Sequence, residues 1–221
     1  MAGRAVSSPA RSLRIALPSL LLLLGPALGP CTAHGRQPEP PMPGTIQERE
    51  AYRLLGSDKP IKARELAEQI LVRHPDSYAG HHVLGRVLHE QEANLPRALF
   101  FLRRAVKLFE EQCAQRGQRC GEEAWRWRAR TLLSLAFLCS DMDRREEELQ
   151  WLDLYDESYK PKRWALRAWA LMKLDRFAEA RQTAWEGIAA PDPDEQDSSW
   201  TALCAIASEE QRFAEAYILC R

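Results

Sequence analysis

The sequence predicts an all-α fold, an α-solenoid of about five helix–turn–helix repeats after an amino-terminal signal segment. Apolar residues recur with helical spacing from Thr45 onward, and no stretch alternates between apolar and polar residues as a half-buried strand would. The sequence also repeats itself, because RFAEA occurs at residues 176–180 and again 36 residues later at 212–216. Internal periods of about 20–50 residues are typical of repeat architectures.

The charge balance argues against a nucleic-acid partner. The chain holds 31 basic and 31 acidic residues, so its formal net charge is zero. Three arginines and no acidic residue fall within residues 1–33, which leaves the remainder slightly acidic. A surface that binds nucleic acid needs a basic patch or stripe to contact phosphates, and the sequence has no such excess of basic residues.

Residues 1–33 have the layout of a secretory signal peptide or a lipoprotein signal. Three arginines precede an apolar run at residues 15–28, and small residues follow it. The run is about 14 residues long, shorter than the roughly 20 that a membrane-spanning helix needs, and Pro18 and Pro26 interrupt it. These features favour an export signal over a transmembrane anchor.

Two alternatives for the end of this signal remain open. Cleavage after Ala33 would release a soluble exported protein. Residues 28–31, LGPC, instead resemble a bacterial lipobox, in which Cys31 is lipidated and becomes the new amino terminus, although Pro30 stands where Gly, Ala or Ser is usual. Residues 34–44 include the Pro-rich segment QPEPPMPG and are predicted to form a semi-rigid linker.

The remaining cysteines are interpreted in the light of export, because thiols tend to pair outside a reducing cytosol. Cys113 and Cys120 flank the polar segment CAQRGQRC, whose six intervening residues allow a disulfide; two free loop thiols are the alternative. A zinc site needs four ligands, and this segment supplies two. Cys139, Cys204 and Cys220 fall at helical core spacing and are predicted to be small buried apolar residues.

The last two repeats carry the clearest pattern, in which large and small apolar residues recur along paired helices. In the fourth repeat, residues 164–192, these positions are Trp164, Ala168, Leu171, Phe177 and Ala180. In the fifth repeat, residues 200–221, they are Trp200, Leu203, Cys204, Ala207, Phe213 and Ala216. This pattern resembles the tetratricopeptide repeat (TPR), whose unit is about 34 residues long.

The resemblance extends over residues 45–221. The matching positions are Ala63, Ala67 and Ile70 in the first repeat, Leu84, Gly85, Leu88, Ala98 and Ala105 in the second, and Leu132, Leu135, Ala136, Cys139, Leu152 and Tyr155 in the third. It implies that small residues let paired helices approach closely, while leucines and aromatic residues fill the space between them. It also implies that the first helices of the repeats line a concave groove that binds a protein partner.

Two departures from a regular array are informative. Roughly 17 residues are inserted between the second and third repeats, near residues 111–124, and insertions in repeat proteins often lie on a binding face. The fifth repeat stops at Arg221, about two turns into its second helix. We therefore expect either a longer chain or a partner, including a second copy, that covers this end.

Carrying the TPR groove positions over to this sequence gives a mixed apolar and charged surface. The implied residues are His82, Arg86 and His89 in the second repeat, Arg130, Leu133, Phe137 and Asp141 in the third, and Trp169, Met172 and Lys173 in the fourth. Phe137, Trp169 and Met172 are the expected apolar anchors, and aromatic and arginine side chains are the usual hot spots of interfaces. The Asn residues with which TPR clamps hold a partner's terminal carboxylate are absent from these positions.

No catalytic, metal-binding or cofactor-binding motif is found, so the protein is predicted not to be an enzyme and to need no cofactor. Four histidines fall between residues 74 and 89, but the HExxH arrangement of zinc hydrolases is missing. These histidines are interpreted as surface or groove residues. Most of the tryptophans are interpreted as core residues, although Trp125 and Trp127 cannot both face the core from one helix.

The sequence leaves three functional hypotheses. The first is a non-enzymatic scaffold of the bacterial cell envelope, in the periplasm or at the outer membrane, that docks a partner complex through the groove. It resembles the bacterial TPR lipoproteins that help secretion or pilus channels to assemble. The second is the amino-terminal or regulatory portion of a larger enzyme or sensor. The third is a eukaryotic lumenal cochaperone, which keeps the signal and the disulfide without the lipobox.

Overall fold

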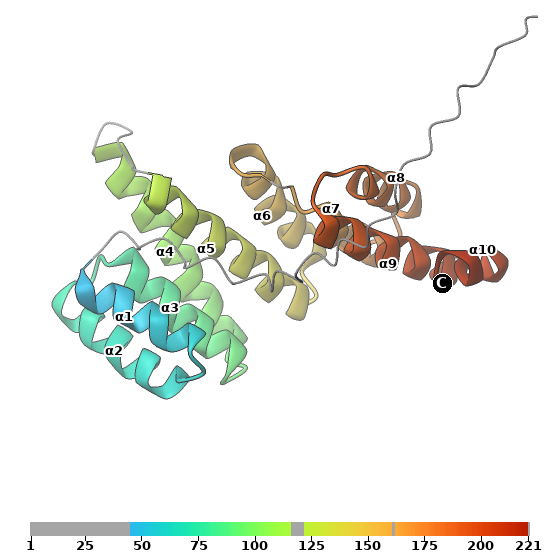
Figure 1. Ribbon diagram of the computed structural model, residues 1–221. Coiled ribbons are helices and arrows are strands. Elements are labelled where there is room, and N and C mark those ends of the chain that lie inside the picture. The colour runs from blue at the N-terminus through green and yellow to red at the C-terminus, as the bar shows by residue number, and fades with distance from the viewer. Residues whose placement is uncertain (1–44, 116–121, 161, 221) are drawn as a thin grey trace, which may run out of the picture. The chain divides into compact units, whose positions relative to one another are not determined.

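Helices account for the regular secondary structure of the described residues, as the sequence predicts (Figure 1). The computed structural model describes residues 45–115, 122–160 and 162–220. Their helices are α1 (Ile46–Gly56), α2 (Pro60–Arg73), α3 (Tyr78–Glu90), α4 (Leu95–Gln115), α5 (Glu122–Asp141), α6 (Arg145–Ser158), α7 (Trp164–Lys173), α8 (Phe177–Ile188), α9 (Pro193–Glu209) and α10 (Phe213–Leu219). The predicted signal and linker, residues 1–33 and 34–44, lie outside the described residues.

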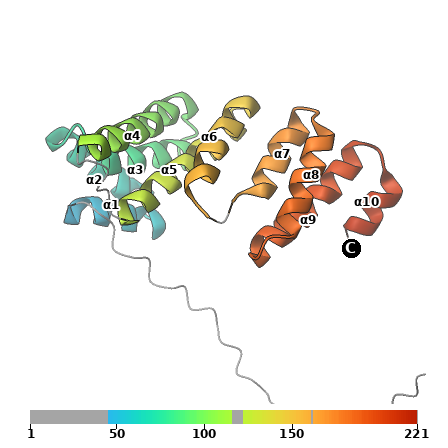
Figure 2. The same cartoon turned by 90° about the horizontal axis from the view of Figure 1, so that it is seen from above.

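Consecutive helices of the described chain pack as five pairs: α1 with α2, α3 with α4, α5 with α6, α7 with α8 and α9 with α10 (Figures 1 and 2). The second helix of each pair also packs against the first helix of the next pair. The first helices α1, α3 and α5 are in contact in series, as are α7 and α9. The predicted helical-repeat solenoid is therefore confirmed.

Each pair turns at a residue in the left-handed region of backbone conformation. Asp58, Ala93, Asp143, Asp175 and Gln211 have φ between 50° and 59°, and each stands two positions before the second helix of its pair. The N–H of the following residue then bonds to a carbonyl near the end of the first helix, which satisfies one of the carbonyls left free there. The same turn occurs in all five described pairs, including the first three, where the sequence pattern is weak.

The helix starts are stabilised by side chains from two sources. Thr45 and Ser77 cap α1 and α3 from the preceding residue, and Asp192 does the same for α9. The start of α7 has no such local cap, and the backbone N–H of Ala165 donates instead to Glu195 Oε1 of α9 at 2.6 Å. The fourth and fifth repeats are therefore joined by a cap as well as by apolar packing.

Paired helices approach closely where one of them carries a glycine or an alanine. A Cβ atom added to Gly85 of α3 would lie 2.7 Å from Leu102 Cγ of α4, well inside contact distance. Leu102 is fully buried and has no room to move aside. The fully buried alanines of the other helices are Ala51, Ala63, Ala67, Ala98, Ala168, Ala170, Ala180 and Ala184. The small residues of the repeat pattern thus lie at helix contacts, as predicted.

Buried apolar side chains form two large clusters that meet at α6. The first cluster takes residues from α1 through α6 and includes Tyr155; the second includes Leu149 and continues through α7, α8 and α9. Ion pairs join α6 to α7 between the clusters, because the Arg167 guanidinium lies 2.7 Å from Asp153 Oδ1 and 3.0 Å from Asp156 Oδ2. The third and fourth repeats therefore meet through charged as well as apolar contacts.

The fifth repeat begins earlier than the sequence predicts. Matching Trp200 to Trp164 places its start at residue 200, whereas α9 begins at Pro193. The difference arises because α9 has 17 residues and α7 only 10. Trp164 is therefore the first residue of α7, whereas Trp200 lies in the middle of α9.

The predicted insertion near residues 111–124 coincides with two long helices. The α4 helix has 21 residues and ends at Gln115, and α5 has 20 residues and begins at Glu122. Residues 116–121 lie outside the described residues. None of the helices in the described part of the chain is both long and apolar enough to cross a membrane.

Replacing Gly85 by Ala should lower the free energy of unfolding by about 1–3 kcal/mol, because a methyl group there overpacks the contact with Leu102. Gly56→Ala is the matched control, since a Cβ atom at that position meets nothing within 4 Å. The control should be neutral or stabilising by up to about 1 kcal/mol, because alanine favours helices more than glycine does. Urea denaturation followed by circular dichroism measures both variants, and equal stability of the two would contradict the close approach.

Candidate functional site

Six of the seven predicted groove residues on α3 and α5 reach the surface, and the structure links these two helices directly. We call this set, together with Tyr52 of α1, the first-helix surface: Tyr52, Arg86, His89, Arg130, Leu133, Phe137 and Asp141. His89 Nε2 of α3 lies 2.6 Å from Asp141 Oδ2 of α5, and the Arg130 guanidinium of α5 stands 5.1 Å from the centroid of the Tyr52 ring. Contacts among three first helices therefore hold Tyr52, Arg130, His89 and Asp141 in place.

Phe137 is the exposed apolar residue of this surface. Its side chain is 48% exposed, although its neighbours Ala136 and Leu138 are buried in the core. Leu133, one helical turn earlier, is partly buried and packs against the same core. An exposed aromatic ring on a packed helix is a candidate anchor for a protein interface, where aromatic side chains are enriched.

His82 does not belong to this surface, which corrects the prediction. Its side chain is fully buried, because α3 is covered by α1 on one side and by α5 on the other. The ring stacks on Tyr52 at 6.0 Å and meets Trp127 edge-on at 5.3 Å between centroids. His82 is therefore a core residue rather than a ligand-facing one.

The hydrogen bonds of His82 assign its proton. The Thr131 hydroxyl donates to the Trp127 carbonyl at 2.9 Å and lies 3.0 Å from His82 Nδ1. Since a hydroxyl has one hydrogen, His82 Nδ1–H must be the donor in the second bond. Burial lowers the pKa of His82 well below its ordinary value, and the nearby Arg86 and Arg130 charges lower it further. The ring is neutral in the folded protein.

The predicted groove residues of α7 also need correction. Met172 is 3% exposed and belongs to the second apolar cluster, because α7 is packed between α8 and α9. Trp169 packs partly against that cluster, and Lys173 Nζ lies 3.8 Å from Glu209 Oε1 of α9. Trp169 and Lys173 thus remain partly exposed, and Lys173 pairs with the fifth repeat.

Two of the cysteines predicted to be buried apolar residues form a disulfide instead. Cys204 of α9 is bonded to Cys220, the residue after α10, with their Cα atoms 5.3 Å apart. Sequence spacing along single helices misses this pair because the bond joins two helices that pack side by side. Cross-linking a loop of this length stabilises a fold by about 3 kcal/mol. The bond therefore fixes the short helix α10 to α9.

The other cysteines differ in whether they are free or bonded. Cys139 is a fully buried free thiol, as predicted, and burial is the main cause that raises its pKa to about 12. Cys113 is disulfide-bonded, but Cys120 lies outside the described residues, so their pairing stays a prediction. Cys31 likewise lies outside them. No group of three or more His, Cys, Asp or Glu side chains is placed to hold a metal within residues 45–115, 122–160 and 162–220.

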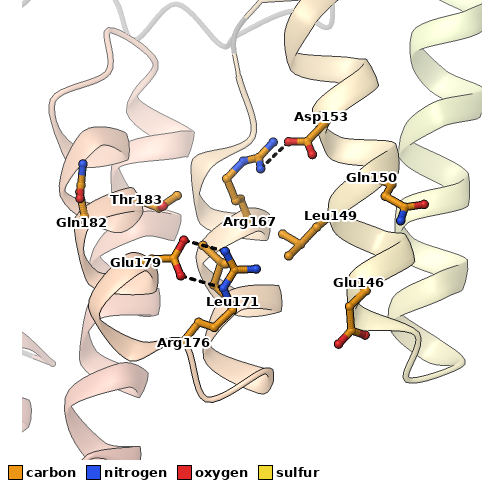
Figure 3. Close-up of a pocket in the computed structure, with 10 residues that line it drawn as sticks. All are labelled: Glu146, Leu149, Gln150, Asp153, Arg167, Leu171, Arg176, Glu179, Gln182 and Thr183. Atoms are coloured by element: carbon orange, nitrogen blue, oxygen red, sulfur yellow. Dashed lines mark hydrogen bonds and ion pairs between the residues drawn. The ribbon is translucent and has the colours of Figure 1, made fainter.

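A polar hollow of about 440 Å³, which the sequence did not indicate, lies between α6, α7 and α8 (Figure 3). Arg167 pairs with Asp153 on one side of it, and both carboxylate oxygens of Glu179 accept hydrogen bonds from Arg176 at 2.8 and 2.6 Å. Leu149 and Leu171 lie between these pairs, and Glu146, Gln150, Gln182 and Thr183 complete the lining.

Comparison with known proteins supports the repeat fold. No protein-family model and no curated protein matches the chain. A Podospora anserina protein with nearly identical TPR-like repeats, described as a kinesin light chain, matches with a TM-score of 0.58 and 18% identity over 79% of this chain and 90% of its own. MamA from AMB-1 matches with a TM-score of 0.52 and 15% identity over 78% and 85% of the two chains. The chain therefore has a TPR-like fold.

The buried His82 should make the protein less stable in acid. The free energy of unfolding should fall as the pH drops below about 6.5, because the unfolded chain then binds a proton that the folded ring excludes. The loss should reach at most about 1.4 kcal/mol per pH unit for each such histidine. His81, whose pKa is also lowered by burial, acts in the same direction.

Urea titrations between about pH 7.5 and pH 5 measure this dependence across the range where histidine titrates. His82→Phe should reduce the slope, whereas His74→Gln, at an exposed position, should leave it unchanged. A slope that His82→Phe does not alter would show that this ring is not the group responsible.

Proposed function

We propose that this protein is a non-enzymatic scaffold, exported to the bacterial cell envelope, that docks a partner protein through the first-helix surface. The observation that carries the proposal is the exposed Phe137 ring on a helix whose adjacent side chains are buried. Burying an aromatic ring is favourable because it removes apolar surface from water. A partner that covers Phe137 would gain this free energy on docking. On the same helix, Arg130 lies about two turns before the ring and Asp141 about one turn after it, so both offer polar groups on the same face.

Two observations support export. The amino-terminal segment has the layout of a signal, and the Cys204–Cys220 disulfide suits an oxidising compartment, where such bonds form and persist. Lipidation of Cys31 and cleavage after Ala33 remain the two alternatives for the mature amino terminus.

Self-association through α10 is a second contact within the same proposal. Phe213 and Ile218 are 69% and 72% exposed, whereas Phe177, the counterpart of Phe213 in the fourth repeat, packs against the second apolar cluster. In the fourth repeat, α9 packs against α8. A helix of a second copy would pack in the same way against α10 and cover its exposed apolar side chains. Cross-linked copies of this chain would be recovered in the experiment below.

Phe137→Ala should weaken capture of the partner at least about tenfold, because truncating a central aromatic anchor costs about 2 kcal/mol or more. The measurement is a cross-linked pull-down of the full-length protein from membranes of its own organism, with quantitative mass spectrometry. Phe100→Ala is the matched control, since Phe100 is 63% exposed on α4 and lies outside the first-helix surface.

Equal capture by Phe137→Ala and the control, with helical circular dichroism unchanged, would contradict docking at this surface. Recovery of no envelope protein by the unchanged chain would contradict the docking function itself. The mass of the amino-terminal fragment in the same samples separates a lipidated Cys31 from cleavage after Ala33.

A further inference from the structure

A second hollow lies beside the one between α6, α7 and α8. It measures about 360 Å³ and shares Asp153 and Arg167 with its neighbour, so the Arg167–Asp153 ion pair borders both. Its other lining residues are Asp156, Glu157, Lys162, Trp164 and Glu186. We call it the Trp164 hollow. It combines one aromatic side chain, four carboxylates and two basic groups.

The four carboxylates of the Trp164 hollow are not equally available. Asp153 and Asp156 are already paired with Arg167, and Asp156 also accepts the backbone N–H of Arg163 at 3.1 Å. Glu157 and Glu186 are exposed, and neither forms an ion pair within the described part of the chain. Lys162 is the one lining cation besides Arg167. The lining therefore keeps a negative charge at Glu157 and Glu186.

Trp164 is the aromatic residue of the lining. It is the first residue of α7, and its Cβ would lie 2.9 Å from a Cβ atom added at Gly187 of α8, so the two helices meet tightly there. An aromatic face next to carboxylates attracts a cation through its quadrupole and through charge. An anionic ligand would instead face the charges of Glu157 and Glu186, with Lys162 as the one lining cation that forms no ion pair within the described residues. The chemistry of the lining thus selects a lysine or arginine side chain.

We propose that the Trp164 hollow binds a lysine or arginine side chain of a basic segment in the partner protein. The inference rests on the proposed function, in which the chain is a protein-binding scaffold. The neighbouring hollow takes a second basic side chain of the same segment, because Glu146 lines it and has no ion pair among the described residues. Together the two hollows present six carboxylates and three basic groups.

The two hollows are separate from the first-helix surface. The hollows lie on α6, α7 and α8, whereas the first-helix surface lies on α1, α3 and α5. A partner that uses both would be held by an apolar anchor at Phe137 and by salt-sensitive contacts at the hollows.

The test is a fluorescence anisotropy titration of the purified, oxidised full chain with a labelled eight-residue peptide that alternates lysine and serine. A peptide that alternates glutamate and serine serves as the charge control. The double variant Glu157→Gln, Glu186→Gln removes two charges at exposed positions with little change in shape. The matched variant Glu65→Gln, Glu111→Gln removes two charges from the exposed faces of α2 and α4.

We expect saturable binding of the lysine peptide, at least fivefold weaker in the Glu157→Gln, Glu186→Gln variant and less than twofold weaker in the matched variant. Trp164→Leu should also weaken binding, with circular dichroism confirming that it folds. Absence of saturable binding, or equal losses in the two double variants, would overturn the proposal. Either result leaves Phe137-dependent capture from membranes unaffected, so the failure of this inference is distinguishable from failure of the docking function.

Discussion

Close approach of paired helices at small residues is the constraint on which the rest of this structure depends. Each repeat of a solenoid contacts only its neighbours, so every pair must bury its apolar face within a short range. Gly85 allows this by leaving no atom where Leu102 needs space. The left-handed turn residues then bring each second helix back along the first. The turn occurs in all five described pairs, and together with the packing at small residues it places α1, α3 and α5 side by side.

The surface features follow from this packing. Covering α3 on both sides buries His82 and leaves polar residues such as His89 to pair across to α5. On α5 the packing buries Ala136 and Leu138 but leaves the Phe137 ring between them 48% exposed. The two apolar clusters both take residues from α6. The Arg167 ion pairs and the polar hollows lie next to this helix, between α6 and α7.

Sequence reasoning predicts the repeats because their signals are local. Helical periodicity and small residues at fixed spacing lie within single repeats, and the doubled RFAEA segment is a short match between two adjacent repeats. It assigns His82 and Met172 wrongly to the groove because burial depends on helices far away in the sequence, and nine of the 13 residues of α3 are buried. The Cys204–Cys220 bond was missed for a related reason, since helical core spacing suits a buried thiol and a cross-helix disulfide equally well.

Site-specific photocross-linking in the native organism tests the central claim most directly. A benzophenone side chain is placed at residue 137 of the first-helix surface and, in a second strain, at residue 61, where Ile61 of α2 is 73% exposed. The account predicts one abundant adduct with an exported envelope protein from residue 137 and none with that protein from residue 61. No adduct from residue 137, or the same adducts from both positions, would contradict it.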